Sequence, residues 1–234
     1  MLLASLDRLQ QDPLAWAVFM AMVAAAVVSA VTVHEFAHAW SALRLGDRTA
    51  ARQGRVTLNP MAHLDLSGSL LFLIVGFGWG KPTPVDPYAM RIAPRMGMAI
   101  TSLAGPAGNV ATALLLGIPF RLGLVSWNTP GARLGLDGNV SELAAALLAY
   151  AILFNVFLAV FNLIPLPPLD GFSVALGVLP GGAARALAAL RRYGAGPLML
   201  LLFLELFTPV GVFSSVLLPL SSLLGQVVVG HPLR

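Results

Sequence analysis

Three residues that can do chemistry interrupt an apolar run, namely His34, Glu35 and His38 within AVVSAVTVHEFAHAW at residues 26–40. Residues four apart lie on the same face of an α-helix, so the two imidazoles point the same way and can bind one metal ion. The pattern H-E-x-x-H adds a carboxylate that can act as a general base. Because an ionisable side chain at bilayer depth costs about 2.5–3.5 kcal/mol, we expect these residues to be functional.

Zinc is the predicted metal, because it accepts nitrogen and carboxylate ligands in tetrahedral geometry. A catalytic zinc needs a third protein ligand and an open position for water. We predict Asp170 as that ligand, since it follows a later apolar segment at the same expected depth, in FNLIPLPPLDG at residues 161–171. His63 stays an alternative on the same expected side, whereas His231 falls on the opposite side. The sequence therefore predicts one zinc ion.

The composition indicates an integral membrane protein. The chain has 234 residues, of which 58% are hydrophobic and only 10% charged, whereas a soluble domain is about 25% charged. It contains no cysteine, which excludes disulfides and thiolate ligands. A net charge of +4 needs only a basic membrane face, so we expect no nucleic-acid partner. The glycine-rich stretch GFGWGK lacks the spacing of a phosphate loop, so we expect no nucleotide.

Four apolar segments are each longer than the roughly 20 residues that cross a bilayer as a helix. They cover residues 14–43, 96–124, 142–166 and 196–224. The predicted fold is therefore an all-α polytopic membrane protein with about four long transmembrane helices. We expect a single domain over residues 1–234, with its core at about 14–175 and the fourth helix outside that core.

Basic residues set the expected orientation. Ten of the fourteen lie in residues 44–95 and 167–195, which the positive-inside rule places in the cytoplasm. We therefore expect a multi-pass protein of the cell membrane, with its active site toward the cytoplasm. The run 69–79 is too short to span and would reverse this charge bias if it did, so we expect a re-entrant or interfacial segment. Residues 54–60 and 81–87 are expected to be short extended, β-like pieces beside it.

Two motifs together carry a family resemblance. HEFAH at residues 34–38 and NLIPLPPLDG at 162–171 resemble the paired motifs of the site-2 protease family, which are intramembrane zinc metalloproteases. GPAGN at 105–109 and GWGKPTPVDP at 78–87 resemble its compact bacterial and archaeal branch, which has no PDZ or CBS domain. The resemblance covers residues 15–175.

The resemblance implies a role for each matching residue. The two histidines and Asp170 would bind zinc, and Glu35 would activate the attacking water. Asn162 would help to position the substrate or the developing oxyanion. Residues 54–87 would form a sheet that pairs with an unwound transmembrane protein or peptide substrate. The remaining expected site residues share a place in the substrate cavity: Asn109, Thr57 and Val85.

Two other functions fit part of the pattern. A membrane zinc transporter can place such a histidine pair in a helix, but it needs further polar residues along a path. A catalytically inactive scaffold that binds membrane helices would not need the general base Glu35. Asn155 is expected to hydrogen-bond between helices, while the role of Glu205 stays open. The sequence does not specify a regulator or a homo-oligomer.

Overall fold

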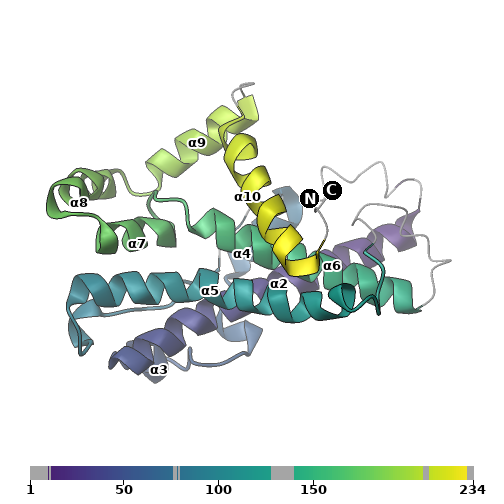
Figure 1. The fold of residues 1–234 in the computed structure, drawn as a ribbon, viewed down its shortest axis with the longest axis horizontal. Coiled ribbons are helices and arrows are strands. Elements are labelled where there is room, and N and C mark those ends of the chain that lie inside the picture. Colours follow the sequence, from purple (N-terminus) through teal and green to yellow (C-terminus); the bar gives the residue numbers. More distant parts are fainter. Residues whose placement is uncertain are drawn as a thin grey trace.

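The chain is all-helical in the computed structural model (Figure 1), which describes residues 10, 12–75, 78, 80–127, 140–207 and 211–230. The α-helices of these residues are α2 (Pro13–Leu45), α3 (Thr49–Arg52), α4 (Leu66–Val75), α5 (Pro94–Arg121), α6 (Val140–Asn162), α7 (Asp170–Val178), α8 (Gly181–Ala188), α9 (Gly196–Phe207) and α10 (Val212–Val229). Among the described residues there are also three short 3₁₀ helices: η2 (Pro60–Ala62), η3 (Pro87–Ala89) and η4 (Ala189–Tyr193).

Three helices, α2, α5 and α6, are long and apolar enough to cross a membrane. The first begins where the side chain of Asp12 accepts a hydrogen bond from the N–H of Ala15 at 2.9 Å, with Pro13 in the first turn. It ends at Gly46, whose φ of 111° suits glycine. Its 33 residues span roughly 50 Å, more than a hydrocarbon core of about 30 Å. This helix can therefore carry a functional site at one end and still cross the bilayer.

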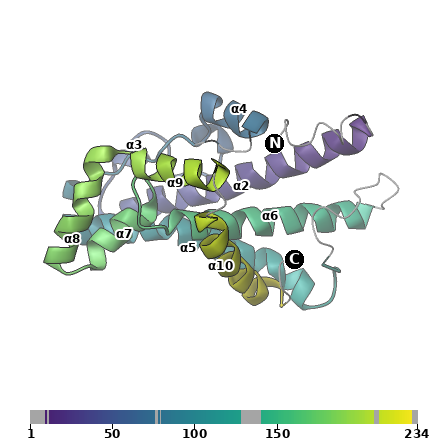
Figure 2. The ribbon, with the colours of Figure 1, turned by 90° about the horizontal axis from the view of Figure 1, so that it is seen from above.

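Neighbouring spans run in opposite directions, and α5 contacts α2, α6, α7 and α10 (Figure 2). His34 and His38 of α2 contact Asn109 and Thr101 of α5, in reverse chain order. The connection between these two helices begins and ends at the same place, because the N–H of Arg91 donates to the carbonyl of Leu45 at 2.8 Å. This return agrees with the expectation that the run 69–79 does not cross the membrane.

The fourth apolar segment differs from its prediction. Residues 196–224 do not form one continuous helix, because α9 ends at Phe207 and α10 begins after Gly211, whose φ is 52°. Helix α9 also follows residues 181–193 at a bend of 79°, and this bent pair is a candidate fourth span. The described part of the chain therefore has three candidate spans, or four if the bent pair counts as one.

The predicted β-like sheet at residues 54–60 and 81–87 is wrong. Among the described residues no strand forms, and the one strand-like contact is an isolated antiparallel bridge between Leu64 and Gly80. Three of the seven residues in KPTPVDP are prolines, which have no N–H to donate to a ladder. Residues 81–86 consequently have no regular secondary structure.

Two buried side chains hold this connection together in place of a ladder. The guanidinium of Arg55 donates to the carbonyls of Ala62 and Lys81 at 2.5 and 3.2 Å. The imidazole Nε2 of His63 pairs with the carbonyl of Thr57 at 2.8 Å. Arg55 is 5% exposed and His63 is 0% exposed. These contacts satisfy carbonyls that a sheet would have paired with backbone N–H groups.

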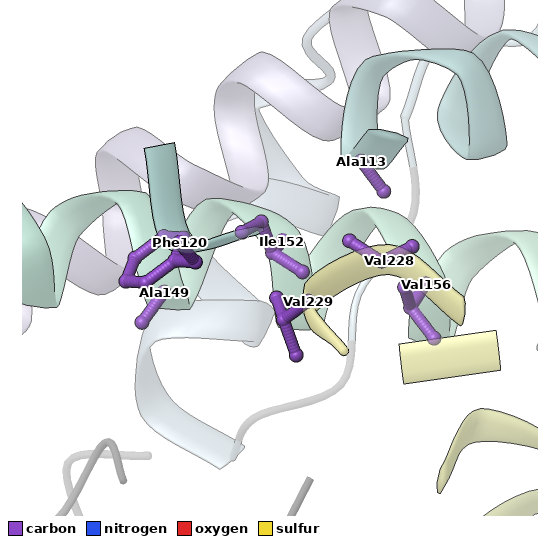
Figure 3. Close-up of a cluster of buried hydrophobic side chains, with 7 residues drawn as sticks. All are labelled: Ala113, Phe120, Ala149, Ile152, Val156, Val228 and Val229. Carbon is purple, nitrogen blue, oxygen red and sulfur yellow. The ribbon is translucent and has the colours of Figure 1, made fainter. Parts of the chain in front are cut away.

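A buried apolar cluster joins α5, α6 and α10 (Figure 3). Its members are Ala113, Phe120, Ala149, Ile152, Val156, Val228 and Val229. Helix α10 approaches closely at Gly117, where a Cβ would lie 2.4 Å from the carbonyl oxygen of Val228. Arg121 donates from Nε to the same carbonyl at 2.9 Å. Small residues and hydrogen bonds of this kind hold helices together in lipid.

Candidate metal centre

The structure brings together the three predicted ligands. His34 and His38 lie one turn apart on α2, and Asp170 is the first residue of α7. The two Nε2 atoms are 3.0 Å apart, and the Oδ2 atom of Asp170 lies 3.0 Å from the first and 3.2 Å from the second. Both histidines are buried. Among the described residues, these three form the group that could hold a metal ion, and His63 is not part of it.

The backbone of α5 fixes the tautomer of His38. Its Nδ1 lies 2.7 Å from the carbonyl oxygen of Thr101. A carbonyl can only accept a hydrogen bond, so Nδ1 carries the proton. The Nε2 atom of the neutral ring then presents a lone pair to the other two ligand atoms, as metal ligation requires.

The side-chain amides of Asn109 and Asn155 fix the tautomer of His34 in the same way. Its Nδ1 lies 2.7 Å from Oδ1 of Asn109. The Nδ2 group of Asn109 donates to the carbonyl of Ala30 at 2.9 Å and to Oδ1 of Asn155 at 2.8 Å, so its Oδ1 is the acceptor that faces the histidine. Asn155 in turn donates to the carbonyl of Ala151 at 2.8 Å. Contacts between α2, α5 and α6 therefore set the direction of the Nε2 lone pair of His34.

Three lone-pair atoms that converge within about 3 Å repel one another unless a cation lies among them. Ligands at about 2.0 Å from a tetrahedral zinc are about 3.3 Å apart, close to the spacing seen here. The Oδ2 atom of Asp170 is buried and faces both Nε2 atoms, so a metal ion among the three atoms would balance its negative charge. The donor set, two imidazoles and one carboxylate, also suits zinc.

Asp170 is ionised at neutral pH. Burial by itself raises the pKa of this carboxyl, but hydrogen bonding and charge from His34 and His38 lower it to about 2. Because metal ligands must be deprotonated, the ionised carboxylate is the form of Asp170 that can bind a metal ion.

Close packing of α7 on α5 places Asp170. A Cβ on Gly177 would lie 2.2 Å from the Cβ of Ala99, so glycine permits this approach. Arg95 at the start of α5 donates to the carbonyl of Leu176 at 2.5 Å. A cationic side chain at the last carbonyls of a helix is favourable. The carboxylate therefore reaches the histidines from a helix that is held at its far end.

Gly105 leaves room for the two imidazoles. A Cβ at this position would lie 2.5 Å from Nε2 of His38 and 2.7 Å from Cε1 of His34. Asn109 comes four residues later and so lies on the same face of α5. The segment GPAGN thus presents a gap and a hydrogen-bond acceptor to the same histidine pair.

The carboxylate of Glu35 is held from outside the helices. Both the N–H and the hydroxyl of Thr83 lie within hydrogen-bonding distance of its Oε2 atom, at 2.9 and 2.7 Å. Thr83 belongs to the irregular residues 81–86. The candidate base and the candidate metal ligands are therefore adjacent on α2 but have different supports.

Three other predicted residues keep their roles as predictions. Asn162 donates from Nδ2 to the carbonyl of Leu158 at 3.0 Å, within its own helix. The hydroxyl oxygen of Thr57 accepts from the N–H of Asn59 at 3.1 Å. Val85 is half-buried in the irregular segment. These contacts neither place the three residues in a substrate cavity nor test that role.

Sequence reasoning missed parts of the support around the ligands. Asn109 contacts His34 directly, which was not predicted, and its expected place in the substrate cavity stays a prediction. Asn155 forms the predicted bond between helices, and its partner is Asn109. Thr101 acts through its backbone carbonyl, for which no residue type is a signal. The only sequence signal for the role of Thr83 is its place as a polar residue between two prolines.

Comparisons with known proteins agree with zinc as the metal. The chain is 36% identical over 215 residues to "Putative zinc metalloprotease YwhC" of Bacillus subtilis, covering 89% of each protein. It is 33% identical over 200 residues to "Putative zinc metalloprotease Rip2" of Mycobacterium tuberculosis, covering 82% of this chain and 70% of the relative. The Rip2 protein of Mycolicibacterium smegmatis is 32% identical over 204 residues. No protein-family model and no solved structure matches the chain.

Proposed function

We infer that this chain, which belongs to the site-2 protease family of zinc metalloproteases, hydrolyses peptide bonds within or near transmembrane segments of other membrane proteins. The observation that carries this proposal is the group of His34, His38 and Asp170, because both histidines and the adjacent Glu35 lie on a helix apolar enough to span a bilayer. A protease of soluble substrates has no need of such a helix for its metal ligands.

Each residue of the site has a different role in the proposed hydrolysis. His34, His38 and Asp170 would hold zinc, which when bound supplies a Lewis acid and lowers the pKa of a bound water toward neutrality. Glu35 accepts a proton from the attacking water and passes it to the leaving amine. Asn162 donates a hydrogen bond to the oxyanion that develops on the scissile carbonyl.

The substrate we propose is a transmembrane protein or peptide in the bilayer. Every backbone group of a membrane helix is hydrogen-bonded within that helix, so the scissile segment must unwind before hydrolysis. We place the protein in the cell membrane with its active site toward the cytoplasm, because the basic residues gather in the connections at that end.

Cleavage of a transmembrane reference peptide by the purified protein in detergent tests this function. We expect cleavage by the zinc-loaded wild type and its loss on addition of a chelator. Glu35→Gln should lower turnover by at least about 100-fold, because a general base contributes that much. Zinc should stay bound one-to-one in this variant, since the ligands are intact.

A matched control is Glu142→Gln, which makes the same chemical change at the exposed start of α6 and should leave turnover unchanged. Full activity of Glu35→Gln would contradict the assigned base. Zinc uptake into vesicles without any cleavage would instead favour a transporter. Peptide binding with zinc bound but without cleavage would favour a scaffold.

A further inference from the structure

Thr83 makes a concentrated set of contacts with the candidate base. Its N–H and hydroxyl converge on one carboxylate oxygen of Glu35, Oε2, at 2.9 and 2.7 Å. The hydroxyl also lies 3.1 Å from the backbone carbonyl of Glu35. We propose that Thr83 is a positioning residue for this base, which it holds in one orientation for proton transfer. This role rests on the proposed function.

The sequence around Thr83 makes its N–H a fixed donor. Pro82 and Pro84 flank it, and a residue that precedes proline is restricted to extended conformations. Neither proline has an N–H. The N–H of Thr83 is therefore the single backbone donor of this tripeptide, and the structure directs it to Glu35. A segment with few accessible conformations loses little entropy when it holds another group.

Both ends of the irregular segment 81–86 are attached to the rest of the connection. The N–H of Lys81 donates to the carbonyl of His63 at 2.7 Å. The N–H of Asp86 donates to the carboxylate of Asp47 at 2.8 Å. Asp47 is fully buried and follows the end of α2 by two residues. Thr83 is thus held relative to the same helix that carries the base.

The contacts favour different roles for the two carboxylate oxygens of Glu35, one that is held by Thr83 and one that accepts the proton. Within the described part of the chain, the hydrogen bonds of the Glu35 side chain end on Oε2. We therefore assign proton acceptance to Oε1. A flexible glutamate would have to find this orientation in each catalytic cycle, which lowers the rate without changing the metal ligands.

Kinetics of two variants with the reference peptide test this role. Thr83→Val keeps the shape and the N–H but removes the hydroxyl, so kcat should fall about tenfold while KM stays within about twofold. Thr83→Ser keeps the hydroxyl and should retain most of the activity. Zinc should bind one-to-one in both. The matched control is Thr112→Val, because the Thr112 hydroxyl bonds only one turn back to Gly108 on α5 at 2.9 Å.

A cross-link tests the contact without relying on activity. The chain has no cysteine, so a short bifunctional thiol reagent, which spans the length lost from the glutamate side chain, should link Thr83→Cys to Glu35→Cys. Thr112→Cys combined with Glu35→Cys is the control pair, and we expect it to stay unlinked. Equal linking of the two pairs, or none in the first, would overturn the proposed contact.

The outcomes separate this role from the proposed function. If the wild type cleaves the peptide and Thr83→Val is equally fast, the positioning role is wrong and the protease function stands. Equal loss in the serine and valine variants, or loss of zinc, would show a merely structural residue. If the zinc-loaded wild type does not cleave the peptide, the proposed function is wrong. The positioning role of Thr83 is then wrong as well, even where the cross-link forms.

Discussion

The two sides of the site rest on different kinds of structure. The histidines are held by Asn109 and the Thr101 carbonyl, both buried on the membrane-spanning helix α5. Glu35, on the same helix as the histidines, is held by Thr83 from an irregular, half-buried segment. The first support is fixed by helix packing, and the second by a connection outside the spans.

Because the two supports differ, metal binding and base positioning can be altered separately. Changes in the contact between α2 and α5 should lower zinc affinity, and activity should fall with it. Changes in residues 81–86 or their anchors should lower turnover while zinc stays bound. Variants of each side should therefore be measured for both zinc affinity and turnover.

The largest effect on zinc is expected from Asn109→Ala, which removes the partner of His34 Nδ1. Loss of such a partner typically lowers metal affinity by about 10–100-fold. Asn155→Ala leaves Asn109 in place and removes only one of its two acceptors, so we expect a loss of less than about tenfold. Competition with a zinc chelator measures both. Equal zinc affinity in the wild type and Asn109→Ala would contradict the histidine-side assignment.

A smaller loss of zinc affinity, about tenfold, is expected from Gly105→Ala. The new Cβ would lie 2.5 Å from the imidazole of His38, so the ring must shift. Gly108→Ala is the matched control on the same helix, because its Cβ would meet the Cβ of Ala37 at 3.0 Å and no ligand. The same chelator competition compares the two. A greater zinc loss in Gly108→Ala would show general helix displacement instead.

The smallest effect concerns Asp47, which anchors residues 81–86. Burial alone raises the pKa of this carboxyl, but hydrogen bonds from Thr49 and Asp86 and the charge of Arg52 lower it below its ordinary value. A carboxyl whose pKa is lowered on folding stabilises the fold above its unfolded-state pKa, about 3.9, and this contribution is lost as the pH falls through the folded value.

Asp47→Asn should therefore lower the free energy of unfolding by about 1 kcal/mol at pH 7, and the difference should shrink below about pH 4. Unfolding in detergent at several pH values measures this. We also expect reduced turnover at pH 7 with zinc still bound. A difference that does not depend on pH, or that comes with zinc loss, would contradict the separation of the two sides.

The spans could be predicted from the sequence because long apolar runs have few alternatives in a bilayer. The ends of helices α2, α5 and α6 lie within a few residues of the ends of the predicted segments. The prediction failed at 196–224, where composition alone did not show that a new helix begins after Gly211. It also failed for the β-like pieces, because apolar alternation does not reveal that buried Arg55 and His63 bind the carbonyls.

The site could be predicted where chemistry depends on residue type and spacing. The pair His34 and His38 follows from helix geometry, and Asp170 from its expected depth. The supports could not be predicted in this way. Thr101 contributes a carbonyl that every residue has, and the contact of Thr83 with Glu35 joins positions 48 apart in the chain. Such contacts depend on how a connection folds back.

The order of the ligands along the chain has a consequence for the newly made protein. Two ligands and the base lie on the first span, but Asp170 follows His34 by 136 positions, 170 minus 34. At about 5–20 residues per second, synthesis of the intervening chain takes roughly 7–27 s. Helix α7 must then dock on α5 before the third ligand arrives. A nascent chain therefore lacks a complete metal site until nearly all of its core has been made.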